Sequence, residues 1–562
     1  MAKTKYEEQI DAVIEKQIDA LFSKYELGRD VFKKADWRMP LRLKEGATGT
    51  TNCLALMVDA CGIIAKERYK LETNRNVIEV VGSARMIELY ANIGLPRNYT
   101  HWSYGKQIEI MERNFDVGAM NLAFEIVINS NPTIASCMNT NSNMMMLLVI
   151  AHASFGHNTF FKNNVLFKEN TNADEILGDL ERMADYVAEC EQKYGIDRVE
   201  KLLDACHALG AHAVDYSPRV PKYKSPVELA AHYAALELAR ERSYNPRAED
   251  TKIKDWQKDS FSALLTARDP NVPLGEQNLL RVIGEMAPHL ESWERRIIGM
   301  ICDRAQYFYP QQQTKMGNEG CASFVHWKTM HDLHDLGLIN DGMMIDFFQS
   351  HTGATQQLDE SGPQVRINPY ALGFAMSEDI ERICKDPTDE DKKWFPSFAG
   401  SYIGYPERPG SQDYMDVIKD FWFNYNDVGR IYQYLSPKVM HDFRMFTVLA
   451  DDKKGAVVTA VADDLGFEEI RRTMAESYDL TRSVPSISFL DYDERGDRTL
   501  TLKHQSINRK TLADDDAVET LKHIKYLWKH PVVLVDFDED EKPIRTLAVP
   551  TMQKSRVLSP RP

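Results

Sequence analysis

The pattern of hydrophobic and polar positions divides the chain into a long helical part and a shorter part rich in strands. Apolar residues recur at helical spacing over residues 83–93, 106–115, 141–155, 174–194, 197–208, 290–309 and 319–336. One strand-like run, at residues 124–129, lies among these helices. After residue 442, strand-like runs are interrupted by helical patterns at residues 466–478 and 514–528. The pattern therefore predicts a mainly α large N-terminal domain and a small α+β C-terminal domain.

The same pattern gives approximate domain boundaries. Residues 1–75 combine an N-terminal helix with an irregular, turn-prone extension. Residues 76–441 form the helical domain, and the charge- and proline-rich stretch at about 217–280 is predicted to be a solvated insertion. Residues 442–562 form the small C-terminal domain.

Composition and charge narrow the class of protein. With 562 residues, 43% hydrophobic and 27% charged, the chain is ordinary for a globular protein and long enough for two or more domains. The formal net charge of −16 argues against nucleic-acid binding, which needs clustered Lys and Arg. The longest apolar runs fall short of the roughly twenty residues of a membrane span, and the charged start is no secretory signal. Scattered cysteines without a C-x-x-C pair are typical of reduced thiols, so we expect a cytoplasmic protein without a membrane span.

The strongest local feature is the pair His152 and His157, which follows a very apolar helical run. A buried imidazole needs a partner for each ring nitrogen, and a metal ion with an acceptor behind the ring provides both. Helix positions five apart differ by about 140° around the axis, but Gly156 would permit a local bulge that brings the rings together. Two separately hydrogen-bonded histidines are the alternative.

A second feature lies on the helix predicted at 319–336, where Glu319 and His326 share one face. A helix with two histidines, followed by a distant Asn-Glu-Gly helix, is the ligand pattern of helical zinc metallopeptidases. The sequence therefore predicts a divalent metal ion held by His152, His157 and Glu319, with His326 as a further ligand or as a support behind the ligands. The nitrogen and oxygen donors favour zinc. Glu319 as a simple first-turn acid is the alternative.

The metallopeptidase pattern is incomplete at one position. In those enzymes a glutamate directly follows the first histidine and acts as the general base, whereas this chain has Ala153 there. Glu191, Asp204 and His207 are the candidate acid/base residues that would replace it. Asp204 and His207 share a helix face, and an ordinary surface Asp–His pair is the alternative explanation for them. Phosphate-binding loops, dinucleotide fingerprints and the serine-hydrolase elbow are absent from the sequence.

Many short motifs together resemble one known family. They occur in order at residues 101–106, 125–132, 151–164, 202–209, 306–310, 318–320, 367–376, 435–438 and, in the small domain, 495–501. Between about residues 76 and 540 the chain resembles the SpoVR (stage V sporulation protein R) family. It departs from the family pattern at Cys321 and Val325, where tryptophans are typical, and at Gln349 and Gly353, where His and Asn are typical.

The resemblance implies a setting and partners, but no settled activity. It implies a cytoplasmic protein of sporulation and spore cortex formation, or of stress physiology in other bacteria. It also implies partnership with a PrkA-type serine kinase and a von Willebrand factor A-like protein. Two hypotheses follow. The chain is a metal-binding, hydrolase-like protein that lacks the usual general-base glutamate, or it is a non-enzymatic regulator or scaffold.

Overall fold

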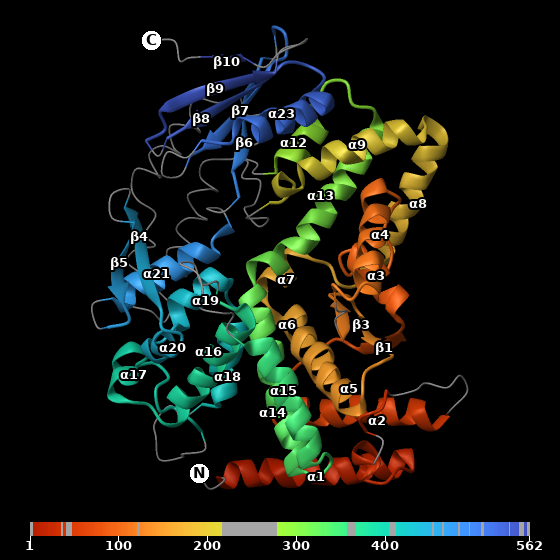
Figure 1. The fold of residues 1–562 in the computed structure, drawn as a ribbon, viewed down its shortest axis with the longest axis vertical. Coiled ribbons are helices and arrows are strands. Elements are labelled where there is room, and N and C mark those ends of the chain that lie inside the picture. The colour runs from red at the N-terminus through yellow and green to blue at the C-terminus, as the bar shows by residue number, and fades with distance from the viewer. Residues whose placement is uncertain are drawn as a thin grey trace, which may run out of the picture. The chain divides into compact units, whose positions relative to one another are not determined.

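The chain folds into two compact units in the computed structural model, each built from two separate stretches of sequence (Figure 1). The first unit comprises Met1–Gln192 and Pro310–Asp479, and the second comprises Lys193–Tyr309 and Leu480–Pro562. The structure describes residues 4–34, 37–40, 48–120, 124–215, 278–356, 367–403, 412–451, 455–463, 466–480, 484–493, 495–506, 511–538, 540–549 and 556–558. Most of the predicted insertion at 217–280 lies outside these residues.

The first unit begins with two helices, α1 (Lys5–Tyr25) and α2 (Thr48–Glu67). Thr4 caps α1 by accepting a hydrogen bond from the Glu7 amide, while the Glu7 carboxylate accepts one from the Thr4 amide. The presence of α2 differs from the irregular extension expected before residue 76. Its buried side chains, among them Leu56, Ala60 and Ile64, recur every four residues and pack into the core. Burial of this apolar face outweighs the turn-prone glycine and threonine at the start of the helix.

A small sheet follows, with strand order β1-β3-β2. Its strands are β1 (Asn76–Val81), β2 (Glu125–Ile128) and β3 (Thr133–Met138). β1 runs parallel to β3, and β2 runs antiparallel to it. The strand expected at 124–129 is confirmed as β2, whereas β1 and β3 were not predicted.

The core of the first unit is a continuous helical stretch that changes its winding. It comprises α5 (Asn143–Val149), the π-helix η2 (Ile150–His157) and α6 (Asn158–Asn163). Every residue of α5 and η2 is buried. This stretch is long and apolar enough to cross a membrane, but 89% of its most apolar window is buried inside the protein, as expected for a core helix.

The central helix of the unit is α14 (Lys315–Asp335), which contacts η2 and α16 (Pro369–Lys385). A Cβ atom on Gly156 of η2 would lie 2.5 Å from Cα of Ala322, and one on Gly320 would lie 2.4 Å from the carbonyl carbon of Gly373 on α16. Because positions 320 and 322 are about 200° apart around a helix, η2 and α16 pack on opposite sides of α14. Glycine at these crossings permits backbone-to-backbone approach.

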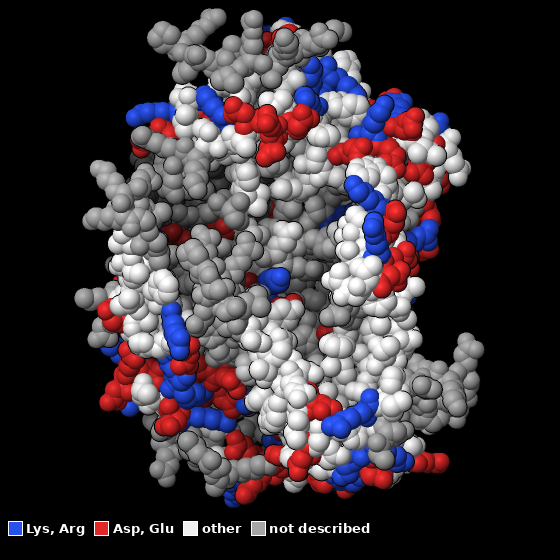
Figure 2. Space-filling view, viewed as in Figure 1, with Lys and Arg blue, Asp and Glu red and all other residues white. Residues whose placement is uncertain are grey.

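The remaining elements of the first unit surround this core. They are η1 (Val31–Lys33), α3 (Ser83–Ala91), α4 (Trp102–Asp116), α7 (Val165–Asn170), α8 (Ile176–Tyr194), α15 (Asp341–Thr355), α17 (Asp389–Trp394), α18 (Tyr414–Phe423), α19 (Asp427–Tyr434), α20 (Pro437–Asp442), β4 (Phe446–Asp451), β5 (Gly455–Val461) and α21 (Phe467–Tyr478). Acidic and basic side chains lie next to one another in the region of α17 (Figure 2).

The hairpin β4-β5 and α21 belong to the first unit by compactness, although the sequence pattern placed a domain boundary at 442. α21 contacts both strands and also packs against α19, with Phe467 and Ile470 buried in the common core. These apolar contacts explain why residues 442–479 join the helical unit.

The second unit contains a five-stranded sheet with order β10-β9-β8-β7-β6. β7 and β8 are parallel, and the other neighbours are antiparallel. α23 packs on the sheet and against α9. Its elements are α9 (Ile196–Ala208), η3 (Gly210–His212), α12 (Leu279–Met286), most of α13 (Ser292–Gln313), β6 (Ile487–Tyr492), β7 (Leu500–Gln505), α23 (Asp514–Trp528), β8 (Val532–Phe537), β9 (Pro543–Val549) and β10 (Arg556–Leu558). The predicted fold class, a large helical part with a small α+β part, is confirmed.

Candidate metal centre

The π-helix η2 places His152 and His157 on one face. A π-helix closes its hydrogen bonds from residue i to i+5, so residues five apart stack one above the other. The two ring centroids are 4.6 Å apart. A spacing of five residues separates two side chains around an α-helix, but in this π-helix it brings the two histidines together. Gly156 matters here mainly for packing, because a side chain at that position would collide with Ala322.

Each of the two histidines is held through its Nδ1 atom. His157 Nδ1 lies 2.9 Å from Oδ1 of Asn318, and His152 Nδ1 lies 2.9 Å from Nδ1 of His326. Because an amide oxygen accepts only, His157 must carry its hydrogen on Nδ1, and its Nε2 presents a lone pair. The Nε2 atoms of both rings face Glu319.

Glu319 brings a carboxylate to the two imidazoles from α14. Its Oε2 lies 3.6 Å from Nε2 of His157 and 3.9 Å from Nε2 of His152. That oxygen is buried and has no hydrogen-bond partner, while the phenol of Tyr370 donates to the Glu319 carboxylate. Burial raises the pKa of Glu319 above its usual range, although neighbouring His157 and the Tyr370 hydrogen bond act in the opposite direction.

Glu125, at the start of β2, supplies a second carboxylate beside the cluster. Its Oε1 lies 3.9 Å from Nε2 of His152, and β2 packs against η2. Burial, and after it the neighbouring Glu319, raises the pKa of Glu125 to about 8. The side chains of Glu125 and Glu319 are still 18% and 15% exposed, so solvent reaches the site. Sequence reasoning missed Glu125 as a site residue. The available signal was a carboxylate in an otherwise apolar strand.

A third imidazole lies behind His152. His326 of α14 contacts His152 through Nδ1, and its Nε2 lies 2.8 Å from Nδ1 of His351 on α15. Burial, followed by the neighbouring imidazoles, lowers the pKa of His152 and of His326 well below the usual value. Burial and then His331 lower the pKa of His351 to about 4. The three rings are therefore neutral near pH 7.

These donor atoms fit a metal ion. One nitrogen from each of His152 and His157 and one oxygen of Glu319 lie within 4.8 Å of one another. Tetrahedral Zn²⁺ with ligand distances of about 2.0–2.2 Å separates its ligand atoms by roughly 3.3–3.5 Å. The separations of 3.6 and 3.9 Å to Glu319 are close to this value and are too long for hydrogen bonds. A cation between these atoms accounts for the unpartnered oxygen, which two independently hydrogen-bonded histidines leave unexplained.

The other residues predicted for the site are not part of this cluster. Glu191 is near the end of α8 and is not among the residues that converge, and Asp204 and His207 are on α9 in the second unit. His326 lies behind His152 and engages both ring nitrogens with other histidines, so its geometry is that of a support and not of a fourth ligand. The acid/base roles of Glu191, Asp204 and His207 stay predictions.

Fold and site together define a mainly helical protein with a buried cluster of two histidines and a carboxylate at the crossing of two core helices. The family model described as "SpoVR like protein" matches residues 50–483, and that described as "SpoVR-like C-terminal domain" matches residues 485–539. The chain belongs to the SpoVR family.

A relative from Escherichia coli (strain K12), named "Uncharacterized protein YcgB", is similar over most of its length. It is 40% identical over 506 residues, which cover 89% of this chain and 94% of the relative. No solved structure matches the chain.

Proposed function

We propose that this protein is a metal-dependent hydrolase whose metal ion is held by His152, His157 and Glu319. The observation that carries the proposal is the convergence of two imidazole nitrogens and an unpartnered carboxylate oxygen in a buried place. Two nitrogen donors and one oxygen donor favour zinc. When bound, such an ion supplies Lewis-acid polarisation and lowers the pKa of a coordinated water.

The chain's own residues would orient the ligands and move the proton. Asn318 holds His157 with Nε2 directed at the site, and Tyr370 donates a hydrogen bond that steadies the Glu319 carboxylate. Glu125 approaches from β2 and would replace the glutamate that is missing at Ala153. Burial and the neighbouring Glu319 raise the pKa of Glu125 to about 8, and a cation beside it would favour the ionised form that this role needs. Ionised Glu125 would accept a proton from the attacking water at Oε1 and later return it to the leaving group.

The experiment that tests the proposal is metal analysis of the purified full-length chain after reconstitution with Zn²⁺. We expect about one zinc per chain in the wild type and in His331→Ala, whose histidine lies on α14 but outside the cluster. His157→Ala is expected to retain almost none. A wild-type chain that holds no more zinc than His157→Ala would overturn the proposal.

Hydrolysis is tested separately, with p-nitrophenyl acetate as the probe. Glu125→Gln should retain zinc and lose roughly 10²–10⁴-fold in zinc-dependent rate, the usual contribution of a positioned general base. Equal zinc-dependent rates in the wild type and Glu125→Gln would remove Glu125 from the mechanism. Zinc binding without any zinc-dependent hydrolysis would leave a metal site and remove the hydrolase.

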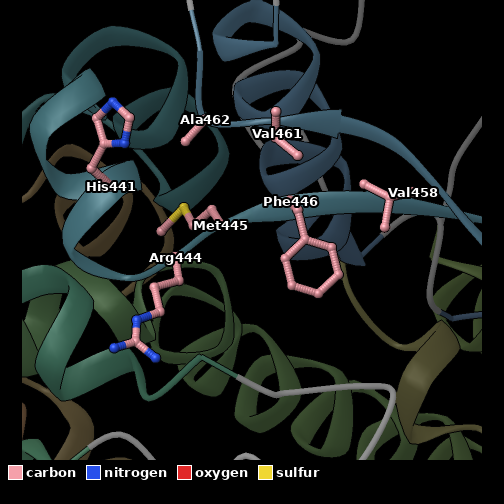
Figure 3. Close-up of a pocket in the computed structure, with 7 residues that line it drawn as sticks. All are labelled: His441, Arg444, Met445, Phe446, Val458, Val461 and Ala462. Atoms are coloured by element: carbon pink, nitrogen blue, oxygen red, sulfur yellow. The ribbon is translucent and has the colours of Figure 1, made fainter.

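A second candidate function, that of a non-enzymatic regulator or scaffold, is favoured by an exposed apolar groove. β4 and β5 form a two-stranded sheet on which Phe446, Val458 and Val461 are about half exposed. The groove is shallow and open, has a volume of about 400 Å³ and is lined by His441, Arg444, Met445, Phe446, Val458, Val461 and Ala462 (Figure 3). Exposed apolar side chains beside strand edges are typical of surfaces that bind an extended segment of another protein.

The setting that we propose is the bacterial cytoplasm, in sporulation and cortex formation or in stress physiology, and family membership supports it. The partners are a PrkA-type serine kinase and a von Willebrand factor A-like protein. Capture of either purified protein by the immobilised full chain, and its loss with Val458→Asp in the groove, would support the scaffold. Capture that Val458→Asp leaves unchanged would remove the groove from the interaction.

A further inference from the structure

A row of three buried imidazoles extends away from the candidate metal centre. His152, His326 and His351 belong to three different elements and are 7, 3 and 5% exposed. The contacts between them are 2.9 Å from His152 to His326 and 2.8 Å from His326 to His351. Both lengths are those of hydrogen bonds between ring nitrogens.

The number of N–H groups on the three imidazoles limits how the row can be hydrogen-bonded. A neutral imidazole has one N–H and one lone pair, and each contact needs one of each. Once the hydrogen of His152 is placed, both other tautomers follow. If His152 donates from Nδ1, His326 accepts at Nδ1 and must donate from Nε2 to Nδ1 of His351.

The proposed metal site sets the direction of the row. A cation held at Nε2 of His152 uses the lone pair of that nitrogen, so the hydrogen of this ring is on Nδ1, the atom that contacts His326. Nε2 of His152 is then left with its lone pair directed toward Glu319 and Glu125.

We propose that His326 and His351 are positioning residues that fix His152 in its metal-binding tautomer before any metal arrives. The proposal rests on the proposed metal site and adds how that site is organised. His351 acts through His326. With Nδ1 of His351 as the acceptor, His326 keeps its hydrogen on Nε2 and its Nδ1 lone pair available to His152.

The surroundings of the row leave few other acceptors for these hydrogens. His351 lies against the rings of Trp327, Phe374 and Phe347, with centroid distances of 4.6, 4.7 and 5.8 Å. His326 also lies against Phe347, at 5.9 Å. Aromatic carbon atoms neither accept nor donate an ordinary hydrogen bond, so the imidazoles satisfy one another.

Zinc affinity, measured by competition with a chromophoric chelator, tests the effect of the row. His326→Phe removes the acceptor and is expected to weaken binding about tenfold, at the lower end for residues that support metal ligands. His326→Asn restores an acceptor where Nδ1 stood and should bind within about threefold of wild type. His351→Phe should weaken binding severalfold, although its side chain is two rings from the ion. His331→Phe, on the same helix and outside the row, is the matched control and should bind as wild type.

Nitrogen-15 NMR of histidine-labelled wild-type chain reads the tautomers without any substitution. We expect His152 to carry its hydrogen on Nδ1, and His326 and His351 to carry theirs on Nε2, in the metal-free protein and equally with zinc. In metal-free His351→Phe, His326 should gain the opposite tautomer. A hydrogen on Nε2 of His152 in the metal-free chain would overturn the proposal, even if the variants failed to fold.

The two proposals fail in different ways. A zinc-loaded wild type whose His326→Phe variant binds zinc equally well overturns the row and leaves the metal site intact. A wild type that binds no zinc overturns the metal site, and the positioning role falls with it. Equal weakening by His326→Asn and His326→Phe would show that bulk at this position matters and not the acceptor, which also overturns the row.

Discussion

Two buried polar clusters meet the same helix, α14, within its first turns, and they differ in how their hydrogen bonds are satisfied. At the start of the helix, Asp427 accepts from the amides of Met316 and Gly317, at 2.8 and 3.0 Å, and from Arg430 at 2.8 Å. Arg430 also donates to the carbonyls of Phe421 and Trp422. Less than one turn later, Glu319 has an oxygen without a partner, directed at two imidazole nitrogens.

The difference separates a cluster whose charges are paired within the protein from one that leaves a carboxylate oxygen available to a ligand. An ion pair in the protein interior is tolerated when its two groups are paired and further hydrogen-bonded, as in the Asp427–Arg430 cluster. Leaving a buried carboxylate oxygen unpaired costs about 1–3 kcal/mol. The Glu319 cluster, with its unpartnered oxygen, is the one that the proposed cation site requires.

Breaking the satisfied cluster should have the largest effect on stability. Asp427→Ala leaves Arg430 buried without its counter-ion and removes the cap from α14, so we expect a loss of about 3–5 kcal/mol in the free energy of unfolding. Urea denaturation measures it. Asp442→Ala, which removes the exposed pair with Lys438, is the control and should cost under about 1 kcal/mol. A loss as small as that from Asp442→Ala would contradict the view that the Asp427–Arg430 cluster stabilises the fold.

Zinc binding at the Glu319 cluster should stabilise the folded protein, by a somewhat smaller amount than Asp427→Ala destabilises it. At a free zinc concentration of about 100 times the dissociation constant, binding to the folded state adds about 2.7 kcal/mol. Thermal unfolding with and without zinc should show this gain in the wild type and in His331→Ala, but not in His157→Ala. A gain of equal size in His157→Ala would place the zinc somewhere other than at this cluster.

Elements with a regular apolar pattern could be predicted from the sequence, whereas elements that depend on tertiary packing could not. The strand-like runs after residue 442 correspond to β4 to β8, and α21 was also predicted. β9 and β10 were not predicted. α2 was missed because its first residues have turn composition and only burial of its apolar face makes it a helix. β1 and β3 pair through contacts distant along the chain, from Asn76–Thr133 to Val81–Met138, which local pattern does not report.

The candidate site could be predicted in part, for a comparable reason. His152, His157 and Glu319 were identified because helical motifs keep ligands at recognisable spacing. The π-helix that joins the histidines could only be suspected from Gly156, since a change of winding depends on packing against Ala322. Glu125 arrives from a strand, and only the packing of β2 on η2 shows that it faces the histidines.

The far end of α14 offers a pH-dependent test of a third buried carboxylate. Burial raises the pKa of Asp332 to about 6, although Arg68 and the Tyr69 phenol, at 3.0 and 2.6 Å, act in the opposite direction. The folded state then binds more protons than the unfolded state between about pH 4 and pH 6, so this carboxyl's contribution is present below that window and is lost as the pH rises through it.

Wild-type stability relative to Asp332→Asn should therefore fall by roughly 1–2 kcal/mol from pH 4 to pH 7, within the limit of about 1.4 kcal/mol per pH unit for one group. Urea unfolding at several pH values measures the difference. Asp335→Asn, at an exposed position on the same helix, is the matched control for the loss of one carboxylate. A relative stability that rises with pH would mean that the ion pair with Arg68 outweighs burial.

The smallest expected effect on stability separates the two clusters most sharply. Replacing a carboxylate by an amide should change the free energy of unfolding in opposite directions at the two sites. In metal-free protein, Glu319→Gln replaces a buried, unpartnered carboxylate oxygen and supplies an amide hydrogen toward Nε2 of His157, so we expect a gain of about 1 kcal/mol. Asp427→Asn, the equivalent change at the satisfied cluster, removes the charge that pairs with Arg430 and should destabilise. Urea denaturation in the presence of a chelator compares the two variants directly.

A loss of stability from Glu319→Gln as large as that from Asp427→Asn would make both clusters structural and would favour the scaffold over the hydrolase. A gain coupled to loss of zinc binding would mean that the wild type retains a less stable side chain because the metal requires it.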